Sequence, residues 1–268
     1  MSAPPGAIVV GVDGSADSDR ALEWAAAAGS QRRAGLHLVH ALPQPPYAVP
    51  YPTAEEEQHR DFAQRLLGEA RARVEPWGVP LTVEIVDALA TPALLGAGEH
   101  AMMIVVGSRG HGAVAGLLQG SVSQHVSRHA SCPVVVVRER ADPKARRIVV
   151  GVDGSASCDK AIGFAFDAAS RSEAPLTAIH AWHDMTTFAV AGPSYAALAN
   201  VAERISAGER LLGQALAGWA EKYPGVTVTR EAIPVHPGRV DRTPPSTPPW
   251  SWSAHAVAAS SPGCCWDR

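Results

Sequence analysis

The feature of the sequence that most restricts its fold is an internal repeat. AIVVGVDGS at residues 7–15 recurs as RIVVGVDGS at residues 147–155, and each copy precedes a small-residue stretch of helical character. An apolar run ending in His-Ala follows in both copies, LHLVHAL and LTAIHAW, and then a long amphipathic stretch. A period of about 140 residues is too long for a solenoid and indicates two copies of one domain.

Within the first copy, apolar runs alternate with helical stretches. IVVGV and MIVVG are continuously apolar, which is typical of parallel strands buried on both faces. Their order, with a helix near residues 120–130 and PVVVVRE last, predicts a doubly wound, Rossmann-like α/β domain with a five-stranded parallel sheet. Ligands of such sheets bind beyond the carboxyl ends of the strands, at the topological switch point. We therefore expect the site in the residues that directly follow the apolar runs.

These patterns predict four segments. Residues 1–138 form the first domain, 139–146 a charged linker and 147–240 a second, incomplete domain. Residues 241–268 form a tail rich in Pro, Ser, Trp and Cys, without helical or strand periodicity. We expect this tail to be disordered or weakly docked.

Two clusters of residues follow the first and fourth apolar runs. The first is Gly11-Val12-Asp13-Gly14-Ser15, and the second is VVGSRGHGAVAGLLQGSVS at residues 105–123. Glycines let the backbone approach a ligand closely, and Gly120-Ser121 open a helix whose free N–H groups and dipole favour an anion. Arg109 and His111 add hydrogen-bond donors. The second cluster either cradles phosphates or is only a tight strand-to-helix turn, and it matches neither a Walker A loop nor GxGxxG.

The spacing Gly107-x2-Gly110-x9-Gly120-Ser121 resembles the G-2x-G-9x-G-(S/T) pattern of ATP-binding universal stress proteins. The resemblance covers residues 7–138 and continues to about 238, in the manner of the tandem members of high-GC actinobacteria. It implies a regulatory, ATP-binding protein of the stress response, with ATP and a magnesium ion held by the first domain. The cofactor-binding residues that it implies are Gly11, Val12, Asp13, Ser15, Ala41, Gly107, Arg109, Gly110, Gly120, Ser121 and Val122.

The same resemblance implies roles for these residues and a mode of association. Asp13 would lie beside the nucleotide and help to hold magnesium or the loop, and the Ala41 backbone would contact adenine. The glycine-rich residues would enclose the ribose and phosphates. Association through PVVVVRE would give a homodimer or a pairing of the two domains within one chain.

Composition restricts the partners and the compartment. The net charge of −3 argues against broad nucleic-acid binding. No apolar run reaches the roughly 18 residues needed to span a bilayer, and no secretory signal is visible. Four Cys residues without metal-ligand spacing fit a reducing compartment. We therefore expect a cytoplasmic protein with neither nucleic acid nor membrane as a partner.

The second domain shows no copy of the glycine motif in its own reading frame. When the last base of each codon from Pro249 onward is joined to the first two bases of the next, the tail reads VVVVGARGRGVVAGLLLGS. This reading takes G or C at the free third bases and T at Asp267. Two Val codons are fixed if Ser251 and Ser253 use TCN codons, and two Leu codons and one Gly codon are fixed by the residues from Cys264 to Asp267. We hypothesise a single frameshift near residues 236–242, which leaves at most one competent nucleotide site and makes Cys264-Cys265 accidental.

Other polar residues admit more than one interpretation. For His40 and His180, at equivalent strand ends, a packed and hydrogen-bonded side chain is favoured over a metal or catalytic role. His125 and His129, spaced i,i+4, fit a metal site or a solvated helix face, and the solvated face is favoured. No triad or activated nucleophile stands out. An enzyme is therefore not predicted; the alternatives are a slow ATPase, a relative of the adenine-hydrolase superfamily, or a degenerate, non-functional paralogue.

Overall fold

The computed structural model describes residues 3–43, 54–110, 120–138, 147–155, 158–182, 195–233 and 257–258. The chain divides into two compact units, with the division along the main chain after Glu139. The predicted linker at 139–146 lies outside the described residues. Of the predicted tail, only the two-residue strand β9, Val257–Ala258, is described.

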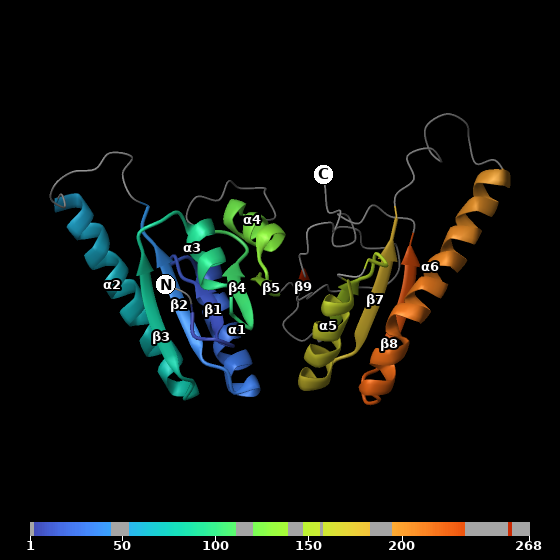
Figure 1. The fold of residues 1–268 in the computed structure, drawn as a ribbon, viewed down its shortest axis with the longest axis horizontal. Coiled ribbons are helices and arrows are strands. Elements are labelled where there is room, and N and C mark those ends of the chain that lie inside the picture. The colour runs from blue at the N-terminus through green and yellow to red at the C-terminus, as the bar shows by residue number, and fades with distance from the viewer. Residues whose placement is uncertain are drawn as a thin grey trace. The chain divides into compact units, whose positions relative to one another are not determined.

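The first unit contains a sheet with the strand order β3-β2-β1-β4-β5-β9 (Figure 1). Strands β1 to β5 pair in parallel, and β1 lies between β2 and β4. The predicted doubly wound parallel α/β fold is therefore confirmed, and its switch point lies between β1 and β4. The elements of this unit are β1 Ile8–Gly11, α1 Ala16–Arg32, β2 Leu36–Ala41, α2 Ala54–Val74, η1 Glu75–Trp77, β3 Leu81–Val86, α3 Ala90–Ala97, β4 Met103–Gly107, α4 Ser121–His129 and β5 Val134–Val137.

The central strands are apolar throughout because both faces of the sheet are covered. Ile8, Val9 and Val10 of β1 are all 0% exposed. Successive side chains of a strand point to opposite faces. Val9 packs in a core with Leu94 of α3 and Val126 of α4, and these two helices also contact each other. Helices α1 and α2 contact each other and the same sheet. Each such buried aliphatic side chain contributes roughly 1.5–3 kcal/mol.

The second unit repeats the first half of this arrangement. Its strands have the order β6-β7-β8 and pair in parallel. Ile148 of β6 pairs with Leu176 of β7, as Ile8 pairs with Leu36 in the first unit, 140 positions earlier. The elements are β6 Ile148–Gly151, α5 Cys158–Ser172, β7 Leu176–Ala181, α6 Tyr195–Lys222 and β8 Val228–Ile233.

Helix α3 is an element that the sequence patterns do not predict. It has only eight residues, no side-chain hydrogen bond caps its start, and Pro92 and Gly96 lie within it. The helix forms because the parallel connection from β3 to β4 needs a crossover and because Ala93, Leu94 and Ala97 are buried against the sheet. Tertiary packing thus supplies what the local sequence does not.

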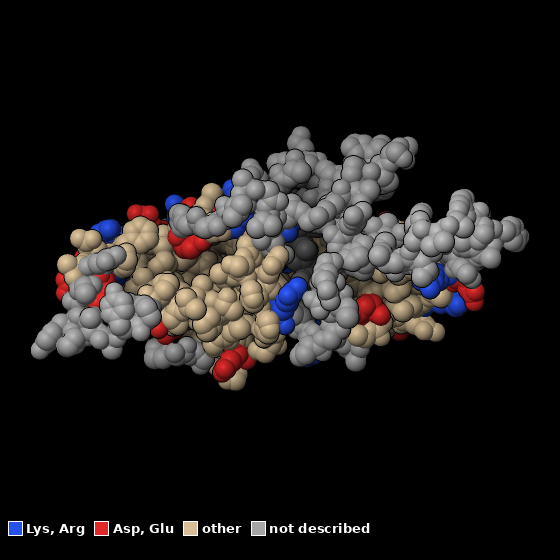
Figure 2. Space-filling model, turned by 90° about the horizontal axis from the view of Figure 1, so that it is seen from above, with Lys and Arg blue, Asp and Glu red and all other residues tan. Residues whose placement is uncertain are grey.

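The surface of the described residues carries charges of both signs. On the face seen from above, Lys and Arg alternate with Asp and Glu around uncharged surface, and the part drawn in colour shows no continuous basic field (Figure 2). No helix among the described residues is long and apolar enough to cross a membrane.

Candidate functional site at the carboxyl edge of the first sheet

The loop after β1 is held by the first turn of α1. The Ser18 hydroxyl donates to the Gly11 carbonyl at 3.4 Å and accepts the Asp13 N–H at 3.2 Å. The Ser15 N–H donates to Asp13 Oδ1 at 2.9 Å. Gly14 between them has φ +82°, a conformation that strains residues with a Cβ. These contacts fix the Asp13 carboxylate at the end of β1.

Ser15 connects this loop to the turn after β4. It is the N-cap of α1, and its hydroxyl accepts the Ser18 N–H at 3.2 Å. The same hydroxyl donates to the Arg109 carbonyl at 3.3 Å. The two clusters that follow the first and fourth apolar runs are therefore in direct contact.

Ser108 is the centre of the turn after β4 and is 3% exposed. Its N–H donates to the Val137 carbonyl of β5 at 2.9 Å, and its hydroxyl donates to Asp17 Oδ2 at 2.6 Å. Its carbonyl accepts the N–H of Gly120 at 2.7 Å and the hydroxyl of Ser123 at 3.4 Å. One residue thus joins β5, α1 and the start of α4.

Asp17 brings a buried negative charge to this junction, because its side chain is 5% exposed. Burial raises the pKa of Asp17, but hydrogen bonds from Ser108, Arg20 and Arg109 outweigh burial and hold the pKa below its ordinary value. The Arg109 Nε lies 3.4 Å from Asp17 Oδ2. The first turn of α1 adds a favourable helix dipole, so the carboxylate remains ionised.

The glycines of the turn are explained by close neighbours. A Cβ on Gly107 would lie 2.7 Å from the carbonyl carbon of Asp17 and 2.8 Å from the backbone N of Ser18. A Cβ on Gly110 would lie 2.5 Å from Asp13 Oδ2. Gly107 is therefore required for packing, whereas Gly110 leaves room for the Asp13 carboxylate.

The start of α4 follows the turn after β4. Gly120 is its N-cap, in extended conformation and without a side-chain cap hydrogen bond. The first N–H groups of a helix have no partner within the helix, and here they belong to Ser121 and Val122. The Arg109 side chain, which leaves the neighbouring turn, is half exposed. Backbone donors and a guanidinium therefore lie on the same edge of the sheet.

The structure places the predicted site residues in three groups. Gly11, Asp13, Ser15, Gly107, Arg109, Gly110 and Gly120 belong to the hydrogen-bonded junction, and Ser121 and Val122 begin the helix that follows it. Val12 is buried directly after β1, and its N–H donates to the Val39 carbonyl at 2.9 Å. Ala41 ends β2 and packs against the core. His111 and the rest of residues 111–119 lie outside the described residues.

Asp17, Ser18 and Ser108 were missed by sequence reasoning. Asp17 and Ser18 follow the N-cap Ser15 and so have a weak local signal. Ser108 stands between two motif glycines, where nothing in the sequence indicates the side chain with which its hydroxyl pairs.

Each of the four histidines considered in the sequence has a ring nitrogen within hydrogen-bond distance of a backbone carbonyl. His40 Nδ1 lies 2.7 Å from the Val12 carbonyl and His180 Nδ1 2.7 Å from the Val152 carbonyl, which confirms the predicted hydrogen-bonded histidines. His125 and His129 are on the exposed face of α4, each with Nδ1 against the carbonyl four residues earlier. Among the described residues, no group of three His, Cys, Asp or Glu side chains could hold a metal.

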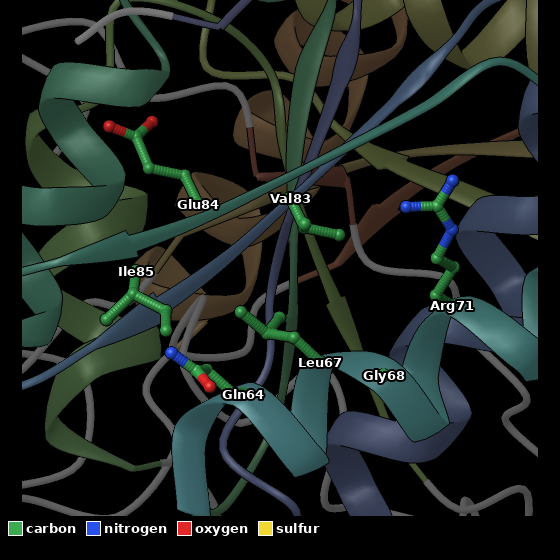
Figure 3. Close-up of a pocket in the computed structure, with 7 residues that line it drawn as sticks. All are labelled: Gln64, Leu67, Gly68, Arg71, Val83, Glu84 and Ile85. Carbon is green, nitrogen blue, oxygen red and sulfur yellow. The ribbon is translucent and has the colours of Figure 1, made fainter. Parts of the chain in front are cut away.

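A separate groove of about 350 Å³ lies between α2 and β3. Val83 and Ile85 point toward Leu67 and Gln64 of α2, whereas Glu84 points away from this helix (Figure 3). Glu84 instead approaches His37, with 3.0 Å between Oε2 and Nε2. The groove is mostly apolar and shares no residue with the junction at the carboxyl edge.

The fold and the junction define the first unit as a doubly wound α/β domain with the start of α4 and the Arg109 side chain at its switch point. The chain belongs to the universal stress protein family, whose sequence model matches residues 6–138 and 144–241. Universal stress protein Rv2623 of Mycobacterium tuberculosis is 37% identical over 245 residues, which cover 87% of this chain and 80% of that protein. A universal stress protein of Mycolicibacterium smegmatis is 35% identical over 92% of this chain and 83% of its own length. A universal stress protein structure from Archaeoglobus fulgidus, 19% identical, matches the fold with a TM-score of 0.60 over 88% of this chain and 82% of its own.

The packing at Gly107 gives the first prediction. Gly107→Ala places a methyl group against the α1 backbone, which can make room only by shifting the helix. The substitution should destabilise the first unit by about 1–3 kcal/mol. Gly68→Ala is the matched control, because a Cβ there meets nothing within 4 Å in the middle of α2. The Gly68→Ala substitution should stabilise the first unit by roughly 0.5–1 kcal/mol, because alanine is favoured over glycine within a helix. Hydrogen exchange of β1 and β4 amides measures both, and equal effects would contradict the packing argument.

The ionised Asp17 gives a pH dependence. Because its folded pKa is lowered, the stability it contributes is present above its ordinary value of 3.8 and is lost as pH falls through the folded value. Asp17→Asn should lower the free energy of unfolding by about 1–3 kcal/mol near pH 7 and by less at acid pH.

The measurement is hydrogen exchange of β1 and β4 in both proteins across this pH range. Asp87→Asn, which breaks an exposed ion pair with Arg60, is the control and should cost under about 1 kcal/mol. A constant penalty for Asp17→Asn down to the lowest pH would show that its charge contributes nothing.

Proposed function

We propose that the first unit is a regulatory module that binds ATP with magnesium at the carboxyl edge of β1 and β4. The observation that carries this proposal is the start of α4, which has no side-chain cap and follows the Gly107–Gly110 turn. Helix starts of this kind bind phosphate groups through backbone N–H groups. The motif spacing of the family points to the same residues.

The residues present fit a triphosphate. The N–H groups of Ser121 and Val122 supply donors, and the half-exposed Arg109 guanidinium supplies a positive charge for phosphate oxygens. Gly110 has no Cβ, so the Asp13 carboxylate can lie directly against its backbone. Magnesium bound to nucleotide takes most of its ligands from phosphates and water, so a single carboxylate such as Asp13 suffices.

The nucleoside would occupy the neighbouring strand ends. The Val12 N–H is already bonded to Val39, and its carbonyl accepts a hydrogen bond from His40 when Nδ1 carries the proton. We therefore propose that Val12 contributes only its position at the wall of the nucleoside site and makes no hydrogen bond to the ligand. We assign the adenine contact to the backbone of Ala41 at the end of β2. This assignment places the base over β2 and the phosphates over β4.

We further propose that ATP is bound and not rapidly hydrolysed, so that occupancy itself is the regulatory signal of this stress protein. A general base works best when its pKa is close to the operating pH. The pKa of Asp17 is lowered, which is away from neutral pH, and its carboxylate already accepts hydrogen bonds from Ser108, Arg20 and Arg109. Asp13 Oδ1 already accepts the Ser15 N–H. Neither described carboxylate of the junction is suited to activate water.

The test is calorimetric titration of the full chain with ATP and magnesium, together with an assay for released ADP. Arg109→Gln should weaken ATP binding about tenfold or more, because a charge-assisted hydrogen bond contributes roughly 1.5–3 kcal/mol. Arg60→Gln is the matched control, because Arg60 is 47% and Arg109 50% exposed and each pairs with an aspartate.

Arg60→Gln should leave the affinity unchanged. Equal affinities of the Arg109→Gln variant and the original protein would contradict the assigned phosphate contact. Steady release of ADP at a rate proportional to protein would replace the regulatory proposal with an ATPase.

A further inference from the structure

The second unit contains one half of the same site, in the same geometry. The Ser155 N–H donates to Asp153 Oδ1 at 2.9 Å, the distance found between Ser15 and Asp13. Gly154 has φ +81°, against +82° for Gly14. The loop after β6 is therefore folded as the loop after β1 is.

The contact between the first turn of the following helix and the end of the strand is repeated as well. Cys158 replaces Ser18, and its thiol lies 3.4 Å from the Gly151 carbonyl, as the Ser18 hydroxyl lies 3.4 Å from Gly11. The Val152 N–H donates to the Ile179 carbonyl at 2.8 Å. The second unit thus keeps the strand, the Asp-Gly-Ser loop and the supporting residue at position 158 that correspond to the first half of the site.

The second half of the site has no counterpart among the described residues. In the first unit β1 pairs with β2 and β4, whereas in the second unit β6 pairs with β7 alone in the part of the chain that is described. The family match of the second unit ends at residue 241, before the fourth strand and the glycine-rich turn are due.

We propose that the coding sequence of residues 241–268 contains this missing half, displaced from the reading frame by one lost base or two gained bases. Read from the third base of each codon, residues 249–253 supply four Val codons in a row if Ser251 and Ser253 use TCN codons and the third bases of Pro249 and Ser251 are G. Trp266 and Asp267 together force a Gly codon at the position of Gly120. Cys264, Cys265 and Trp266 force two Leu codons just before it.

The positions of the other glycines are restricted by the genetic code. At the positions that match Gly107, Gly110, Gly112 and Gly116, the second base of the shifted codon is necessarily G. Only Gly, Arg, Ser, Cys or Trp can stand there, and Gly results whenever the preceding third base is G. The four deciding third bases are those of Ser253, Ala256, Ala258 and Pro262.

The unusual composition of the tail has the same explanation. In the shifted frame, an Ala codon GCC followed by G is read as Pro, and a Val codon GTG followed by G is read as Trp. A Leu codon CTG followed by C is read as Cys. An Ala-rich helix and a Val-rich strand of a GC-rich gene therefore become a segment rich in Pro, Trp and Cys, as found at residues 241–268.

The restored segment would complete a second anion-binding edge opposite Asp153 and pair with the side of β6 that faces away from β7. The ligand class is that of the first unit, a nucleoside triphosphate, and this part of the inference rests on the proposed function. The reading-frame proposal itself rests on the codons and on the half-built site.

The first test is the base sequence of the gene across codons 236–268. We expect G as the third base of Ser253, Ala256, Ala258 and Pro262. Any other base at Ser253 or Ala256 would remove a motif glycine and overturn the proposal.

The second test inserts one base between codons 236 and 242 and expresses the gene to its next stop codon. Exchange of the β6 amides should slow by about tenfold or more relative to the original chain, since a fourth strand would now cover them. Unchanged exchange of β6 would overturn the proposal. ATP stoichiometry should rise from one to two per chain, and Asp153→Ala in the restored chain should return it to one. Slower β6 exchange without ATP bound by either chain would support the reading-frame proposal and refute the proposed function.

Discussion

Asp17 is a buried carboxylate that almost no solvent reaches. The arrangement of the carboxyl edge depends on the hydrogen-bond donors and positive charges that this carboxylate needs. A buried charge is tolerated only with paired and hydrogen-bonded neighbours. Ser108, Arg20 and Arg109 supply them, and the first turn of α1 adds its dipole. Because Ser108 also bonds to β5 and to the start of α4, this one carboxylate sets the distance between α1 and the turn after β4. Gly107 then lies so close to the α1 backbone that it has no space for a side chain.

The two units show which parts of such a site form locally. The loop from Asp13 to Ser15 is held by residues within one turn of helix, and its copy at Asp153 has nearly the same glycine φ and the same 2.9 Å between the Ser N–H and the Asp carboxylate. The contact of this loop with the turn after β4 instead needs β4 to pair with β1, a contact between segments about 95 positions apart. The local half of the site is therefore described in both units, and the non-local half only in the first.

The sequence was sufficient for the fold and for the prediction that the residues after β1 and β4 lie together. Continuous apolar runs indicated buried parallel strands, and the residues after them proved to lie together at the carboxyl edge. The hydrogen-bonded roles of His40 and His180 also followed from their places at strand ends. The bond between Ser108 and Asp17 did not, since these residues are 91 positions apart and no local pattern pairs a hydroxyl with a carboxylate. Helix α3 was missed because its stability comes from packing of Leu94 and not from a capped, periodic sequence.

The central claim is that ATP binds where the helix start of α4 meets the turn after β4. Residue-resolved amide exchange of the full chain, with and without ATP and magnesium, tests this claim most directly. The account predicts slower exchange at Ser121 and Val122 and in the loop at Asp13, with no change along the groove between α2 and β3. Protection of the groove residues near Leu67, with unchanged exchange at Ser121 and Val122, would contradict it.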